Sequence, residues 1–135
     1  MKTRPTKQLF SLLAVAYALP LAAQDTALGR QHFADYCAAC HGVEARGDGP
    51  MEGVLFVPPT DLTRLAAESG GRFPVAEVVA KVDGRNPLLA HGSEMPVYGP
   101  YFEGKGVVIR DAFGAPIMTS QPIIDIVSWL KTIQE

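Results

Sequence analysis

The sequence predicts a small all-α domain, because apolar residues recur at helical spacing in several segments of a 135-residue chain. Stretches rich in glycine and proline separate these segments, as expected of the loops between helices. The chain has two cysteines, Cys37 and Cys40, and His41 directly follows the second of them at the end of the first periodic segment. We therefore expect about four helices packed around this Cys-x-x-Cys-His cluster.

The N-terminal segment resembles a signal peptide. Three basic residues precede an apolar run at 9–19, and small residues follow it up to Ala23. A membrane-spanning helix needs about 20 apolar residues, so cleavage after Ala23 is favoured over a retained membrane anchor. We expect a signal peptide at 1–23, one domain at 24–135 and export to the periplasm.

The predicted mature domain is acidic. Three of the 12 Lys and Arg residues precede position 24, whereas all 14 Asp and Glu residues follow it, which leaves a formal net charge of −5. This balance argues against nucleic acid as a ligand and favours a partner protein with a basic or neutral docking surface. It does not indicate an oligomeric state.

The first helix is expected over 26–40, where apolar and small residues form one helical face. Gly29 lies inside this helix, although glycine costs about 1 kcal/mol relative to alanine there. We explain Gly29 by the close approach of the last helix, which begins near Pro122. Trp129 and Leu130 of that helix are expected to contact Gly29 and Phe33.

Two shorter helices are expected between these. Thr60 is a candidate N-cap for a helix at 61–68. A second helix is expected at 74–83, where valines follow helical spacing and Gly84 provides a stop signal.

The pentapeptide at 37–41 is the attachment signature of a c-type haem. The thiols of Cys37 and Cys40 form thioethers to the haem vinyl groups, and the imidazole of His41 reaches the iron. A thioredoxin-type pair would follow a strand in a βαβ pattern, which is not visible here. A zinc site needs about four ligands, and only His32 and His91 remain. A simple disulfide would leave His41 without a role.

The sixth iron ligand distinguishes electron transfer from ligand binding. A methionine thioether keeps the iron six-coordinate and raises its potential. Met95 is the preferred candidate, because it lies in a long loop that Pro96 stiffens. Met118 and His91 are the alternatives, and Met51 is too close to the proximal loop to reach the other face of the haem.

The chain resembles the class I c-type cytochromes of bacterial periplasmic type in the following residues: Gly29, Phe33, Tyr36, 37–42, 47–50, 94–99, Trp129 and Leu130. The resemblance implies an all-α fold around one covalently bound haem c, with the first and last helices crossing near Gly29. It also implies that Pro50 supplies a backbone carbonyl to His41 and that Met95 is the distal ligand.

The chain departs from this family pattern at 101–120, which separates the methionine loop from the last helix. Residues 107–109 are expected to form one strand of a small hairpin there. This insertion keeps Met118 open as an alternative to Met95.

The leading functional hypothesis is a non-enzymatic periplasmic electron carrier that cycles between Fe(III) and Fe(II) and meets redox partner proteins. A second hypothesis makes the domain a haem subunit of a dehydrogenase or oxidase complex. A third is a five-coordinate sensor of small ligands. Five-coordinate bundle cytochromes, which the third would resemble, carry the haem motif near the C-terminus, whereas here it lies near the mature N-terminus.

Overall fold

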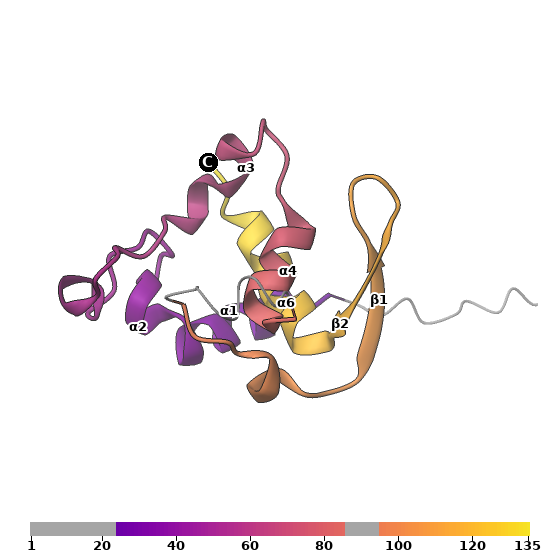
Figure 1. Ribbon diagram of the computed structural model, residues 1–135, viewed down its shortest axis with the longest axis horizontal. Coiled ribbons are helices and arrows are strands. Elements are labelled where there is room, and N and C mark those ends of the chain that lie inside the picture. The colour runs from indigo at the N-terminus through magenta and orange to yellow at the C-terminus, as the bar shows by residue number, and fades with distance from the viewer. Residues whose placement is uncertain (1–23, 86–94) are drawn as a thin grey trace, which may run out of the picture.

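The computed structural model describes residues 24–85 and 95–135, so the predicted signal peptide at 1–23 and His91 lie outside the described part. The α-helices there are α1 (Thr26–Tyr36), α2 (Ala38–His41), α3 (Leu65–Glu68), α4 (Val75–Asp83) and α6 (Gln121–Thr132) (Figure 1). Single 3-10 turns form η1 (Glu52–Val54), η2 (Leu62–Arg64) and η3 (Gly99–Phe102). The predicted, mostly helical architecture is confirmed. None of the helices in the described residues is long and apolar enough to span a bilayer.

Helices α1 and α6 cross at the centre of the domain, as Gly29 predicted. A Cβ atom at Gly29 would collide with the carbonyl oxygen of Asp125 and would lie 2.9 Å from the amide nitrogen of Ile126. The expected reason for the glycine is confirmed, and the atoms nearest to Gly29 belong to the backbone of Asp125 and Ile126 rather than to Trp129 or Leu130.

The core forms where α6 meets α1 and α4. Phe33 of α1 packs on Trp129, with the ring centroids 4.6 Å apart, which confirms this expected contact. Every residue from Ile123 to Leu130 is buried. Val79 and Val82 of α4 join the same cluster. A helix as apolar as α6 is stable in water only when almost all of its surface is covered.

The first helix is shorter than expected. Instead of continuing over 26–40, it ends at Tyr36, and a second short helix begins at Ala38. Cys37 lies at the break with φ −114° and ψ −31°, although its amide still donates to the carbonyl of Phe33 at 2.8 Å. The break changes the direction in which the residues after Cys37 leave the helix.

The helix expected at 61–68 has a different start. Asp61, not Thr60, is the N-cap: its carboxylate accepts hydrogen bonds from the amide and hydroxyl of Thr63, at 2.9 and 2.6 Å. The segment then forms η2 followed by α3. The backbone carbonyl of Thr60 instead contacts His41, as described below.

The fourth helix and the hairpin agree with expectation. Helix α4 ends at Asp83, and its C-cap Gly84 has a left-handed φ of 70°, which favours glycine. Strands β1 (Gly106–Arg110) and β2 (Pro116–Ser120) pair antiparallel and extend away from the helices (Figure 1). In this register Val108 lies opposite Met118.

Candidate functional site

The Cys-x-x-Cys-His cluster lies at the junction of α1 and α2. The amide nitrogen of His41 donates to the carbonyl of Cys37 at 2.9 Å, so one helical turn holds the cluster together. Cys37 is buried and Cys40 is half-buried, and neither forms a disulfide. In the described residues no strand precedes the cluster, which argues against a thioredoxin-type pair.

The two thiols are in different environments. Burial, and to a smaller extent the neighbouring Cys40, raises the pKa of the Cys37 thiol to about 12. Cys37 is therefore a neutral thiol at ordinary pH. With no disulfide between them, both sulfur atoms are available for thioether bonds.

The imidazole of His41 is held in one tautomer. Its Nδ1 lies 3.0 Å from the carbonyl oxygen of Thr60. A carbonyl can only accept, so Nδ1 must carry the proton and Nε2 keeps its lone pair for a metal. Burial lowers the pKa of His41, while the Thr60 hydrogen bond opposes this shift, and the ring is neutral at pH 7.

The carbonyl that holds His41 differs from the expected one. The resemblance assigned this role to Pro50, but the structure places Thr60 there. Around Pro50, the amide of Gly49 donates to Cys40 at 3.0 Å and the amide of Met51 donates to Ala39 at 2.9 Å. This stretch therefore caps the carbonyl end of α2.

Thr60 reaches His41 because the loop between α2 and η2 is tied back on itself. The amide of Gly47 donates to the carbonyl of His41 at 2.8 Å, and the amide of Leu62 donates to the carbonyl of Ala45 at 2.8 Å. A Cβ at Gly47 would collide with the carbonyl of Pro59. The sequence signal for this was the extended Pro-Pro pair followed by the capping Asp61, which together orient Thr60.

The two candidate methionine ligands lie in different surroundings. Met95 is half-buried and packs against the core cluster. Met118 is 69% exposed on the hairpin, and its carbonyl accepts a hydrogen bond from Arg85 at 2.9 Å. Of the nitrogen alternatives, His32 is half-buried with its ring 5.8 Å from that of Phe102, and His91 lies outside the described residues.

An aromatic cluster connects the segment after Met95 with the end of α1. Tyr36 lies 5.0 Å from Phe102 and 6.5 Å from Tyr98, measured between ring centroids. Burial, followed by the thiols of Cys37 and Cys40, raises the pKa of the Tyr98 phenol. Because Tyr98 packs on Tyr36, the segment after Met95 lies against the end of α1, next to Cys37. Sequence reasoning missed this, because aromatic residues far apart in the chain carry no periodic signal.

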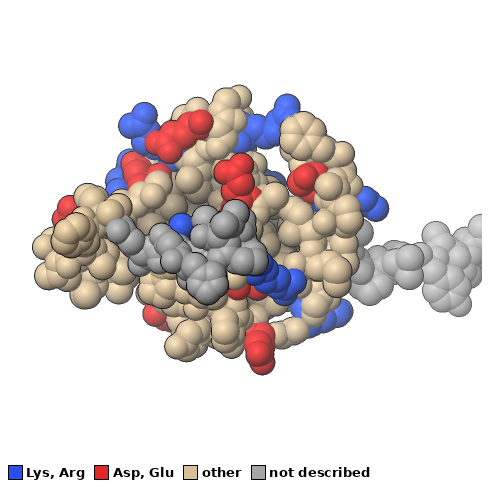
Figure 2. All heavy atoms as spheres, viewed as in Figure 1, with Lys and Arg blue, Asp and Glu red and all other residues tan. Residues whose placement is uncertain are grey.

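A loop of exposed apolar side chains follows the cluster. We call the following residues the apolar loop: Met51, Val54, Leu55, Phe56 and Val57. Phe56 is fully exposed. This loop projects beyond α2 at the left of Figure 1, and the same lobe is largely uncharged in the view of Figure 2. Exposed apolar patches of this kind mark interaction sites.

The donor set fits a covalently bound haem. It provides two unbridged thiols, an imidazole with a free Nε2, and a half-buried thioether. The zinc alternative finds no support in residues 24–85 and 95–135, where no group of three or more His, Cys, Asp or Glu side chains could hold a metal ion.

Comparison with known protein families agrees with this haem-binding donor set. The profile of the family described as Cytochrome c matches residues 26–134. No curated protein and no solved structure matches the chain significantly.

Proposed function

Since the chain belongs to the cytochrome c family and carries covalently bound haem c, we propose that it is a periplasmic electron carrier with His41 and Met95 as axial ligands. The haem iron supplies a one-electron Fe(III)/Fe(II) couple. The observation that carries the proposal is the tautomer of His41, whose Nε2 is free for iron because Nδ1 donates to Thr60.

Different residues around the cluster attach the haem, bind its iron and orient the iron ligand. Cys37 and Cys40 form the two thioether bonds, and His41 is the proximal ligand. Thr60 replaces Pro50 as the residue whose carbonyl orients His41, and this bond also makes the imidazole a stronger donor to iron. Gly49 and Met51, on either side of Pro50, keep α2 intact because their amides donate to its carbonyls.

Met95 is the distal ligand in this proposal. Its half-buried position against the core supports this role, since a thioether bond to iron persists only where water is excluded. The exposure of Met118 on the hairpin argues against the alternative. Tyr98, three residues after Met95, packs on Tyr36 next to Cys37, which supports the return of this segment to the haem.

The test compares Met95→Ala with Met118→Ala in the purified holoprotein. Met95→Ala should abolish the weak far-red charge-transfer band of the oxidised protein and lower the reduction potential, because the sulfur ligand raises it. Met118→Ala is the matched control and should change neither. Loss of the band in Met118→Ala, with retention in Met95→Ala, would reverse the assignment.

The partner surface is proposed to be neutral and to include the apolar loop next to the cluster. Replacing Phe56 by serine should slow electron transfer to the physiological partner without changing the far-red band. A partner with a basic surface would instead respond to the net charge of −5, and added salt would slow the reaction. The electron-transfer rates of the Phe56→Ser variant and of the wild type at increasing salt together distinguish a neutral from a basic docking surface.

Export to the periplasm is proposed from the first 23 residues. N-terminal sequencing of the mature protein should begin at Gln24. A protein isolated with Met1 and retained in the cytoplasm would contradict this part of the proposal.

The hairpin favours a second candidate function, as a haem subunit of a larger dehydrogenase or oxidase. Val108, Phe113 and Met118 expose apolar side chains on it, away from the cluster. Stable co-purification with a catalytic subunit that is lost when residues 106–119 are replaced by a short linker would support this candidate over a free carrier.

A further inference from the structure

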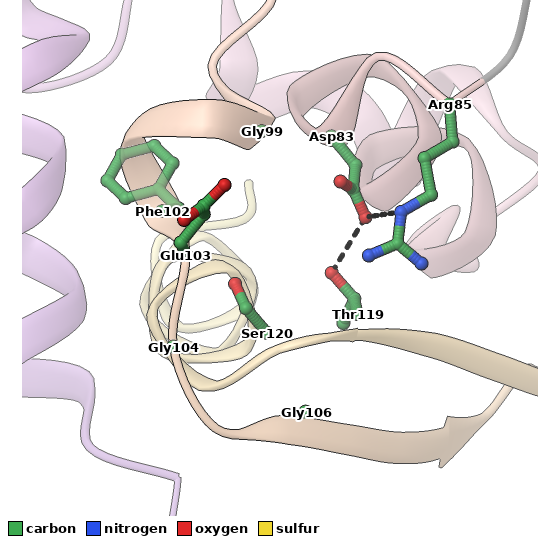
Figure 3. Close-up of a pocket in the computed structure, with 9 residues that line it drawn as sticks. All are labelled: Asp83, Arg85, Gly99, Phe102, Glu103, Gly104, Gly106, Thr119 and Ser120. Carbon is green, nitrogen blue, oxygen red and sulfur yellow. Dashed lines mark hydrogen bonds and ion pairs between the residues drawn. The ribbon is translucent and has the colours of Figure 1, made fainter.

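The two ends of α6 are held differently. At its start, Ser120 lines a cavity of about 370 Å³, and its hydroxyl has no hydrogen-bond partner among the described residues (Figure 3). Asp83 also lines this cavity, where it pairs with Arg85 and accepts a hydrogen bond from the hydroxyl of Thr119. At the other end of α6, the C-terminus lies beside α3 (Figure 1), and hydrogen bonds tie it to the segment that follows Thr60.

Gln134 makes this connection through both ends of its side-chain amide. Its Oε1 accepts a hydrogen bond from the backbone amide of Ala66 at 2.9 Å. Its Nε2 donates to the carbonyls of Leu62 and Leu130, each at 2.8 Å. A backbone amide can only donate and a carbonyl can only accept, so the orientation of the Gln134 amide is fixed and both of its N–H groups are used. The side chain therefore joins the last turn of α6 to both η2 and α3.

Leu62 transmits this connection to Thr60, which lies two residues earlier in the chain. The amide of Leu62 donates to the carbonyl of Ala45 at 2.8 Å, so both backbone polar groups of Leu62 are bonded. The carbonyl of Thr60 lies 3.0 Å from Nδ1 of His41. Because two residues of chain allow little displacement, fixing Leu62 restricts where the Thr60 carbonyl can lie.

Glu135 also contacts this region, but its side chain is open to water. Its amide donates to the carbonyl of Thr63 at 2.9 Å, and its carboxylate pairs with Arg46. The side chains of Arg46 and Glu135 are 48% and 58% exposed, and ion pairs this exposed contribute little to stability. The bonds of Gln134 are partly buried, where competition from water is weaker. Gln134 is therefore the side chain that fixes the segment after Thr60.

We propose that Gln134 is a positioning residue for His41: by fixing Leu62, it holds the carbonyl of Thr60 against Nδ1 and sets how strongly the imidazole donates to the haem iron. The inference rests on the proposed role of His41 as the proximal ligand. A carbonyl bound to Nδ1–H makes the imidazole a stronger donor. A stronger donor favours Fe(III) over Fe(II) and lowers the reduction potential. Disrupting the Gln134 contacts should therefore raise the potential.

The test combines two measurements on the holoprotein: exchange of the His41 Nδ1 proton with solvent, by NMR of the reduced form, and the reduction potential, by redox titration. Gln134→Ala should speed the exchange about tenfold, the factor expected when a local opening is eased by the loss of one or two hydrogen bonds. It should also raise the potential. Gln134→Glu keeps the acceptor for Ala66 but loses both N–H donors, so it should produce the same two changes.

Thr132→Val is the matched control on the same turn of α6. It removes a hydroxyl that donates to the carbonyl of Trp129 at 2.6 Å and leaves the groups that bond to Gln134 in place. Both measurements should therefore keep their wild-type values in this variant, whatever its loss of stability.

Wild-type exchange in Gln134→Ala or Gln134→Glu, or an unchanged potential despite faster exchange, would overturn the proposal. An equal effect of Thr132→Val would do the same, because any weakening of this helix end would then suffice. The proposed ligation is tested separately in the wild type, where the haem ring current should displace the ring-proton resonances of His41. Undisplaced resonances would contradict the ligation, whereas displaced resonances with unchanged exchange would contradict only the role of Gln134.

Discussion

On the proximal side of His41, the chain from Cys37 to Leu62 is held by backbone hydrogen bonds between residues close in sequence. On the distal side, the chain after Met95 is held mainly by aromatic packing, with the amide of Tyr98 donating to the carbonyl of Val82 at 3.1 Å. Backbone bonds specify one geometry, whereas packed rings tolerate small displacements. The proximal side is therefore suited to fixing a tautomer, and, in the proposed coordination by Met95, the distal side to admitting a weak sixth ligand.

Both sides depend on the crossing of α1 and α6, so the largest effect is expected there. Gly29→Val should destabilise the protein by about 4 kcal/mol or prevent folding, because its side chain meets the backbone of Asp125 and Ile126. Urea unfolding followed by circular dichroism measures this. Gly53→Val, at a position with open space around its Cβ, is the control. Similar losses in the two variants would mean that the crossing is not as close as described.

The proximal loop can be compared with the hairpin turn through two glycines of similar conformation. Gly47 and Gly114 have φ of 82° and 85°, but only Gly47 faces a backbone atom, the carbonyl of Pro59. We expect Gly47→Ala to cost about 2–3 kcal/mol and Gly114→Ala about 1 kcal/mol, the latter from the left-handed conformation alone. Thermal unfolding of both variants measures the difference. Equal losses would remove the argument that the proximal loop is tightly packed.

The N-cap next to Thr60 should have a moderate, pH-dependent effect. Asp61→Ala should lower stability by about 1 kcal/mol at pH 7, whereas Asp61→Asn should retain the cap. Hydrogen bonding from Thr63 lowers the pKa of Asp61. The wild-type advantage is therefore complete above the ordinary aspartate pKa of about 3.9 and declines as the pH falls through the lower folded value. Unfolding at a series of pH values tests this, and a pH-independent difference would contradict it.

The smallest effect is expected on the outer face of the hairpin. Val108 is 63% exposed, so Val108→Thr should change the free energy of unfolding by less than about 0.5 kcal/mol. Urea unfolding of the isolated protein measures this change. A larger effect in the isolated protein would indicate that this face is covered by the protein itself.

Local patterns in the chain were sufficient for several features. The cluster at 37–41, helix α4 with its Gly84 stop and the hairpin at 107–109 all depend on residues near one another in sequence. The glycine at position 29 also predicted a close helix crossing. Each of these rests on backbone preferences or covalent spacing, which short segments determine by themselves.

The features that were wrong or missed depend on contacts between distant segments. The carbonyl that holds His41 belongs to Thr60 rather than Pro50, because the loop between them folds back through bonds such as Leu62 to Ala45. Likewise, α1 ends at Tyr36 although its apolar period continues to Cys40. Periodicity records which residues share a face, but it does not record where a packed helix must change direction.

By itself, the sequence determined the haem-attachment chemistry, the helical class and the acidity of the domain, because these follow from residue types and their spacing. Only the tertiary structure decided which carbonyl orients His41 and which methionine is half-buried. These depend on chain segments that are separated in sequence and meet only after the helices pack. Hydrogen bonding and burial act over a few ångströms in space, whatever the separation along the chain.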